Sequence, residues 1–137
     1  MSELSSAAIS AKDAITMPET IQHYFDTLNA KAFEQTAELF TQAGQLCPPF
    51  DKPIAGREAI ARYLIKEASD MTFSPSQCAP AKSEAGKAFM VSGKVKNSLF
   101  AVNVSWLFVL NASAEIELVQ VKLLAKLEEL LRLNQSA

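Results

Sequence analysis

The sequence predicts an α+β fold in which helices pack on the concave face of a curved antiparallel sheet. Two observations predict it. Apolar residues recur at helical spacing up to about residue 70, and beyond it they alternate with a period of two. Strands that follow one another without intervening helices favour antiparallel pairing. The 137 residues contain no repeat and no linker, so we expect a single domain over 16–137 after an N-terminal arm or short helix over 1–15.

The composition excludes several functional classes. There are 13 Lys and Arg against 15 Asp and Glu, a net charge of −2, and no basic cluster is longer than a pair. This argues against nucleic acid and anionic membrane as main partners. No apolar run approaches the roughly 20 residues of a membrane span, and the first residues lack the features of a signal peptide. We expect a cytoplasmic protein with free thiols at Cys47 and Cys78, whose spacing fits neither a metal site nor a redox motif.

Three helices are expected in the first half. The first begins at Pro18, ends at Asn29 and carries one apolar stripe, made of Ile21, Tyr24, Phe25 and Leu28. The second is expected over 32–40, with Phe33, Ala37 and Phe40 facing inward. The third follows Gly56 and buries Ala59, Ile60, Tyr63 and Leu64.

Between these helices, Leu46 and Cys47 precede two prolines, which predicts a short or edge strand, and 51–56 is expected to be a loop. Four strands are then expected, over 71–81, 87–96, 99–110 and 115–122, with turns at 84–86, 97–98 and 111–113. The leucine-rich segment 123–133 is expected to form a terminal helix.

The alternation in the strands predicts an apolar pocket under the helices. One face of 99–110 carries Phe100, Val102, Val104, Trp106 and Phe108, and the next strand adds Glu117, Val119 and Val121. Such a face, closed by helices, typically forms a binding cavity.

Two residues of this region carry a polar atom that needs a partner when buried, the indole N–H of Trp106 and the hydroxyl of Tyr24. One interpretation makes both of them core residues that donate to backbone carbonyls. The other makes them two converging donors at the end of the pocket, which would hold a carbonyl oxygen of a ligand.

Several stretches resemble the nuclear-transport-factor-2-like superfamily, a cone of curved sheet around a helix that includes ketosteroid isomerases and polyketide cyclases. They are YFDTLNA at 24–30, AELF at 37–40 and GREAI at 56–60. A narrower resemblance, from about 21 to 133, is to the C-terminal domain of the orange carotenoid protein. It rests on CPPF at 47–50, KPIAG at 52–56, SGKV at 92–95, NVSW at 103–106, LN at 110–111, LLA at 123–125 and ELL at 129–131.

This resemblance implies a freestanding carotenoid-binding and carotenoid-transfer protein of cyanobacteria. In that family a helix Tyr and a strand Trp, here Tyr24 and Trp106, donate to the keto oxygen of a ketocarotenoid such as canthaxanthin or echinenone. The ring and the start of the polyene would lie among Leu28, Phe73, Phe100, Val104, Val119 and Val121.

Partners also follow from the resemblance. A ketocarotenoid with a keto ring at each end is too long for one domain, so two copies sharing one carotenoid would form a twofold homodimer. A helical carotenoid protein homologous to the missing N-terminal domain would accept the pigment, and a transient membrane contact would supply it. Quenching of singlet oxygen for photoprotection would accompany transfer.

Two positions depart from the family pattern. Leu99 stands where a Trp is common, and Lys122 stands where an acidic residue is common. Both are expected on the outer face of the sheet, which docks the N-terminal regions in the full-length protein. Their loss fits a domain without that partner.

Two other functions are alternatives to carotenoid binding. A ketosteroid-isomerase-like enzyme needs a carboxylate base, and the stretch 46–49 where that base would lie has none. Glu117, the one carboxylate expected on the pocket side, is interpreted as a rim residue, and His23 as a surface residue. The third class is a non-catalytic dimerisation or interaction module, in which the aromatic pocket floor would be simple core. Catalysis is not expected.

Overall fold

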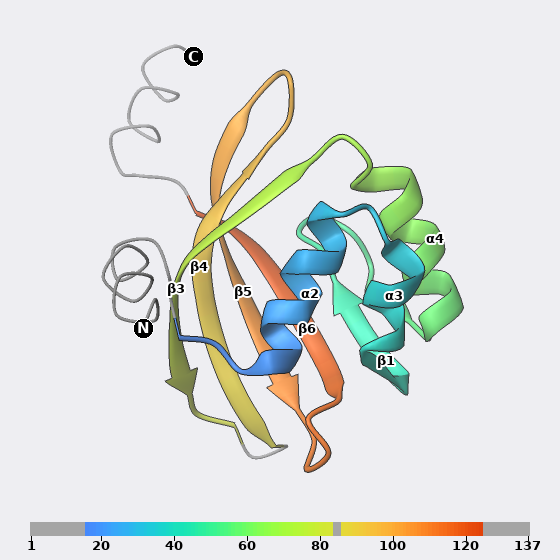
Figure 1. Cartoon of the computed structure of the whole chain (residues 1–137), viewed down its shortest axis with the longest axis vertical. Coiled ribbons are helices and arrows are strands. Elements are labelled where there is room, and N and C mark those ends of the chain that lie inside the picture. Colours follow the sequence, from blue (N-terminus) through green and yellow to red (C-terminus); the bar gives the residue numbers. More distant parts are fainter. Residues whose placement is uncertain (1–15, 84–85, 125–137) are drawn as a thin grey trace, which may run out of the picture.

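The computed structural model describes residues 16–83 and 86–124, and six strands in this part of the chain form one curved sheet in the order β2-β1-β6-β5-β4-β3 (Figure 1). Helices lie on the concave face of this sheet. The elements are α2 (Glu19–Asn29), α3 (Phe33–Glu38), β1 (Phe40–Cys47), β2 (Ile54–Ala55), α4 (Arg57–Glu67), β3 (Thr72–Ala81), β4 (Lys87–Lys96), β5 (Ala101–Leu110) and β6 (Ile116–Leu124).

This architecture confirms the predicted fold class, with one difference in strand direction. The pairs β3–β4, β4–β5 and β5–β6 are antiparallel, as expected for strands joined by turns, whereas β1 and β6 are parallel. Between β1 and β6 the chain passes through β2, α4, β3, β4 and β5 before it returns beside β1. Such a long crossover can bring the last strand back in the same direction.

The first strand differs most from its prediction. β1 begins at Phe40, where the sequence predicts the end of a helix, and it is the second strand of the sheet rather than an edge strand. Its prolines, Pro48 and Pro49, follow its last residue and therefore remove no hydrogen bond from the ladder. The loop predicted at 51–56 contains the two-residue strand β2, which pairs with β1.

The predicted face of α2 is buried in full and that of α4 in part, since Ile60 and Leu64 are buried whereas Ala59 and Tyr63 are half-buried. In α2 the residues Ile21, Tyr24, Phe25 and Leu28 are buried, and Figure 1 shows α2 lying across the sheet with α3 and α4 beyond it. A hydroxyl pair joins α2 to α3, since the Oγ1 atoms of Thr27 and Thr36 lie 2.6 Å apart and Thr36 is fully buried.

The sheet faces follow the predicted alternation. Val104, Trp106 and Phe108 of β5 are buried on the concave side. The edge strand β3 carries Pro75 and Pro80, and its pairing with β4 shifts register just after Pro75.

Three predicted segments lie wholly or partly outside the residues that the structure describes. The N-terminal arm at 1–15, positions 84–85 of one turn and the part of the leucine-rich helix from 125 onward are not described. Leu123 and Leu124, predicted to begin that helix, instead end β6.

Candidate functional site

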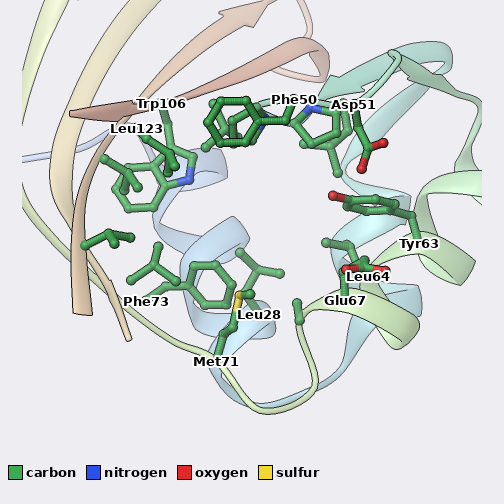
Figure 2. Close-up of a pocket in the computed structure, with 18 of the residues that line it drawn as sticks. Leu28, Phe50, Asp51, Tyr63, Leu64, Glu67, Met71, Phe73, Trp106 and Leu123 are labelled. Carbon is green, nitrogen blue, oxygen red and sulfur yellow. The ribbon is translucent and has the colours of Figure 1, made fainter. Parts of the chain in front are cut away.

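A cavity of about 530 Å³ lies between the concave face of the sheet, α2, α4 and the loop that follows β1 (Figure 2). Most of its wall is apolar. Its lining residues are Tyr24, Leu28, Leu46, Pro48, Pro49, Phe50, Asp51, Tyr63, Leu64, Glu67, Ala68, Met71, Phe73, Val95, Phe100, Val102, Val104, Trp106, Val121 and Leu123.

Seven of the eight predicted ligand-binding residues line this one cavity. Val119 is the exception, because it is fully buried and does not reach the cavity wall. The strand register explains the difference. Val121 pairs with Trp106, whereas Val119 pairs with Phe108, two residues further along β5, where the rings of Tyr24 and Phe25 cover the sheet.

Tyr24 and Trp106 are held by close aromatic packing. The Trp106 ring meets Phe25 edge to face at a centroid distance of 4.8 Å, and the Tyr24 ring meets Phe108 in the same way at 5.0 Å. Only 2% of Tyr24 and 1% of Trp106 is exposed. The packing therefore fixes where their polar atoms point.

Those two polar atoms have no acceptor within the described part of the chain. The Tyr24 hydroxyl and the Trp106 indole nitrogen make no hydrogen bond there, yet no deeply buried polar side-chain atom of the described residues lacks a partner. Both atoms must therefore border open space, and Figure 2 shows the indole nitrogen pointing into the cavity. Among described residues, no backbone carbonyl satisfies either donor, which favours the two-donor interpretation.

Burial keeps the Tyr24 hydroxyl protonated. Loss of solvent raises the pKa of Tyr24 far above its ordinary value, and the nearby Tyr63 hydroxyl raises it further. A neutral phenol and an indole offer two uncharged donors, which suit a neutral carbonyl oxygen.

An amide side chain positions the cavity wall at Phe73. Asn29, the last residue of α2, donates from Nδ2 to the Phe73 carbonyl oxygen at 2.8 Å and accepts from the Phe73 N–H at Oδ1, also at 2.8 Å. These two hydrogen bonds have the pattern found between neighbouring strands, and they join the start of β3 to the end of α2. No local pattern indicates these hydrogen bonds, because the sequence predicts only that Asn29 ends the helix.

Part of the cavity wall was not predicted from the sequence, namely the part that lies opposite the sheet. Tyr63 was predicted on the buried side of its helix but not at the pocket, and Asp51 and Glu67 were not predicted there at all. A spacing of four places Tyr63 and Glu67 on one face of α4, which is a signal that could have been used. The path of the loop that brings in Phe50 and Asp51 has no such signal.

The prediction that Glu117 lies on the pocket side was wrong. Glu117 does not line the cavity, and Asp51 and Glu67 do, both of them exposed at the rim. His23 is exposed on the surface, as predicted.

The described residues offer neither a metal site nor an activated thiol. They contain no group of three or more His, Cys, Asp or Glu side chains placed to hold a metal ion. Cys47 and Cys78 are free and half-buried, and burial raises the pKa of both thiols, which lowers their reactivity near neutral pH. None of the helices described is both long and apolar enough to cross a membrane.

Comparisons with known proteins agree with the resemblance seen in the sequence. The chain is 37% identical over 117 residues to the orange carotenoid-binding protein of Synechocystis sp., covering 82% of this chain and 37% of that protein. It is 35% identical over 119 residues to the protein of the same name from Limnospira maxima, covering 83% and 38%. The chain thus spans little more than a third of these relatives.

Solved structures give the same result. The orange carotenoid protein of Anabaena (Nostoc) sp., described as binding canthaxanthin, superposes with a TM-score of 0.76 at 32% identity, over 90% of this chain and 43% of that one. An epoxide hydrolase/cyclase-like enzyme of salinomycin synthesis has a TM-score of 0.63 at 19% identity, over 77% and 88%, and shows the fold alone.

The relatives at 35–37% identity are named for carotenoid binding, in agreement with the expectation of a binding protein rather than an enzyme. The profile of the nuclear transport factor 2 (NTF2) domain matches residues 17–117, which is most of the chain. With the curved sheet, the helices on its concave face and the cavity between them, the chain belongs to the NTF2 domain family, in the part of it that resembles the C-terminal domain of the orange carotenoid protein.

Proposed function

We propose that this protein binds a ketocarotenoid non-covalently, with the terminal ring in the cavity and the keto oxygen between Tyr24 and Trp106. One observation carries the proposal. Two almost fully buried donors, held by aromatic packing, border an apolar cavity and have no acceptor within the described part of the chain. A ligand carbonyl would accept from these donors, and each neutral hydrogen bond contributes about 0.5–1.5 kcal/mol.

The cavity suits such a ring in size and polarity. Its volume of about 530 Å³ lies within the usual range for small-molecule sites. Leu28, Phe73 and Val104 offer apolar contacts to the ring, and burial of apolar surface is worth roughly 25 cal/mol per Å². The walls therefore supply affinity, and the two donors supply orientation.

The similar proteins support this choice of ligand. Two relatives are carotenoid-binding by name, and the Anabaena structure is described with canthaxanthin. Because this chain spans well under half of each, the ligand is inferred here from the cavity together with that likeness. We propose canthaxanthin or echinenone, the keto-ring type of carotenoid.

A carotenoid seated by one ring leaves most of its polyene outside the cavity. Exposed apolar side chains surround the mouth, with Phe50 91%, Phe100 45% and Leu123 43% exposed. A second copy of the chain that takes the other ring would cover both the polyene and these side chains. We therefore propose a twofold homodimer around one carotenoid.

The proposed role of the dimer is transport and protection in the cytoplasm. It would take up the pigment at a transient membrane contact and deliver it to a helical carotenoid protein that resembles the N-terminal domain of the full-length relatives. While bound, the carotenoid would quench singlet oxygen.

The test is a visible absorption spectrum of the protein purified from a canthaxanthin-producing host. We expect a red-shifted carotenoid band that moves back in Tyr24→Phe and Trp106→Phe. Loss of one neutral hydrogen bond should weaken binding by about three- to tenfold in each variant. Cys78→Ser, which alters a half-buried residue away from the cavity wall, is the control. A colourless wild type would contradict the proposal and favour an interaction module.

A further inference from the structure

A short segment closes one side of the cavity. It joins α4 to β3 at positions 68–71, and we call it the strap. Its two ends, Ala68 and Met71, line the cavity, and Phe73 follows them on β3. Figure 2 shows Met71 and Phe73 on the side of the cavity away from Phe50. The position of the strap therefore sets the shape of this side of the cavity.

The strap leaves α4 in a tight turn. The Met71 N–H donates to the Ala68 carbonyl oxygen at 3.1 Å, and the Ala68 N–H donates to the Leu64 carbonyl oxygen at 2.8 Å. Ser69 and Asp70, between the two ends of the strap, are exposed. Both hydrogen bonds are local, so neither of them fixes the strap against another element.

A lysine side chain makes that connection. Lys31 lies in the turn between α2 and α3, and its ammonium donates to the Ala68 carbonyl oxygen at 3.3 Å and to the Met71 carbonyl oxygen. One side chain thus holds both ends of the strap. The carbonyl oxygens at the end of a helix carry partial negative charge, and Ala68 caps α4, so a cation suits this position.

The backbone at Lys31 has a conformation that favours glycine. Its φ is 63°, its N–H donates to the Leu28 carbonyl oxygen at 3.1 Å, and the Ala32 N–H donates to the Thr27 carbonyl oxygen at 2.9 Å. These two hydrogen bonds form the Schellman pattern that ends many helices, and glycine is common there because it lacks a Cβ atom. The turn alone does not favour lysine at this position, whereas the contacts with the strap do.

The contact affects the position of the strap more than the stability of the fold. Lys31 is exposed, so water can replace its ammonium at both carbonyl oxygens. Loss of the ammonium should therefore leave the protein folded, with a strap that is no longer fixed to the α2–α3 turn.

We propose that Lys31 is a positioning residue for the bound carotenoid, because its ammonium holds the strap so that Met71 and Phe73 stay in contact with the ring. This inference rests on the proposed function and deepens it. Asn29, from the same turn, fixes Phe73 through its backbone. The turn that ends α2 thus controls how quickly the ligand leaves the cavity.

The experiment measures the release of canthaxanthin. Protein purified from a canthaxanthin-producing host is mixed with an excess of phosphatidylcholine vesicles, and the loss of the red-shifted band gives the release rate. Lys31→Met, which removes the ammonium, should release the pigment about three- to tenfold faster, which corresponds to one hydrogen bond. Lys31→Arg keeps a charged donor and should stay within about twofold of the wild type.

Lys31→Gly separates positioning from stability. Glycine suits the left-handed backbone, so the urea midpoint of this variant should stay near that of the wild type. Its release of canthaxanthin should nevertheless be as fast as that of Lys31→Met, because the ammonium is missing in both.

Lys66→Met is the matched control. Lys66 lies in the last turn of α4, is exposed and does not line the cavity. The substitution removes the same charge near the same helix end, but it removes no hydrogen bond to the strap. Its release rate should equal that of the wild type.

Met71→Ala tests whether Lys31 acts through the strap. This variant should itself release canthaxanthin faster, and on its background Lys31→Met should add less than about twofold. The inference would be overturned by wild-type rates in Lys31→Met and Lys31→Gly, by an equal acceleration in Lys66→Met, or by the full effect of Lys31→Met on the Met71→Ala background. In each of these cases a coloured wild type still supports the proposed function, whereas a colourless wild type would overturn both.

Discussion

The side chain of Tyr24 is almost fully buried, yet its hydroxyl borders the cavity and has no protein acceptor among the described residues. Its ring is fixed between Phe25, Phe40 and Phe108, so the side chain cannot turn away to find solvent. The same packing holds Phe25 against Trp106. The aromatic cluster thus keeps two donors in place before any ligand arrives, and this preorganisation reduces the entropy lost on binding.

The raised pKa of Tyr24 predicts how stability changes in alkaline solution. In the unfolded chain this phenol titrates near pH 10, whereas in the folded chain it keeps its proton to higher pH. Above about pH 10 the unfolded state loses the proton first. The free energy of unfolding should then fall by up to about 1.4 kcal/mol per pH unit from this group, with no such change below pH 9.

Urea unfolding at pH values from 8 to 11 measures this effect. Tyr63, Cys47 and Cys78 also have raised pKa values and contribute with the same sign, so the comparison is with Tyr24→Phe. The variant should lose stability less steeply above pH 10. Parallel curves for the two proteins would contradict the prediction.

At the residue scale the sequence located the site well on the strands and poorly on the loop. Alternation along β5 put Val104 and Trp106 on the correct face, because period two leaves no other choice. It could not separate Val121 from Val119, since both share a face and only the register with β5 decides which one reaches the cavity. Asp51 lies at the rim because of a loop path that no local pattern encodes.

At the scale of elements, the side-chain amide of Asn29 makes the hydrogen bonds to β3 that a neighbouring strand would otherwise make. The two hydrogen bonds between Asn29 and Phe73 hold β3 against α2. Asn29→Ala should therefore lower the free energy of unfolding by about 1–2 kcal/mol, because two backbone groups lose their partner. Chemical denaturation measures the change. Asn103→Ala, on the outer face of β5, should stay within about 0.5 kcal/mol, and equal losses in both variants would count against the explanation.

Close approach of β3 to β4 predicts a second effect. A Cβ atom at Gly93 would lie 2.7 Å from the Cα of Pro75 and would also press on the Ser74 carbonyl oxygen. Gly93→Ala should cost about 1–3 kcal/mol of stability, as for other overpacked sites. Thermal unfolding beside Ser92→Ala, its neighbour on the strand, checks this. A normal melting temperature for Gly93→Ala would show that the strands can separate at no cost.

The prediction at Phe40 shows why element boundaries were harder than element types. Its spacing from Phe33 and Ala37 fits a helix, and it is indeed buried. However, the Ile116 N–H donates to the Leu39 carbonyl oxygen at 2.9 Å, which recruits the chain into the sheet just before Phe40. A hydrogen bond between residues so distant in sequence is invisible to local periodicity. It places β1 beside β6, and β2 on the other side of β1 makes β1 an interior strand.

At the scale of the whole molecule, the exposed apolar side chains at the cavity mouth and the length of the proposed ligand predict a dimer. Light scattering should give the apo chain a smaller mass than the loaded protein, which should have twice the 14.9 kDa of one chain. Absorption should give one carotenoid for two chains. A loaded protein that remains a monomer with one carotenoid per chain would contradict the proposed dimer.

The prolines of β3 restrict how copies of this protein can meet. β3 is the last strand of the sheet, and Pro75 and Pro80 interrupt the row of N–H groups that an incoming strand would need. Because this edge of the sheet lacks those donors, it resists the addition of a further strand, which is the route by which many β proteins aggregate. A protein that presents Phe50 and Phe100 to solvent at its cavity is therefore protected from strand addition at that edge, and the proposed dimer would form at the cavity instead.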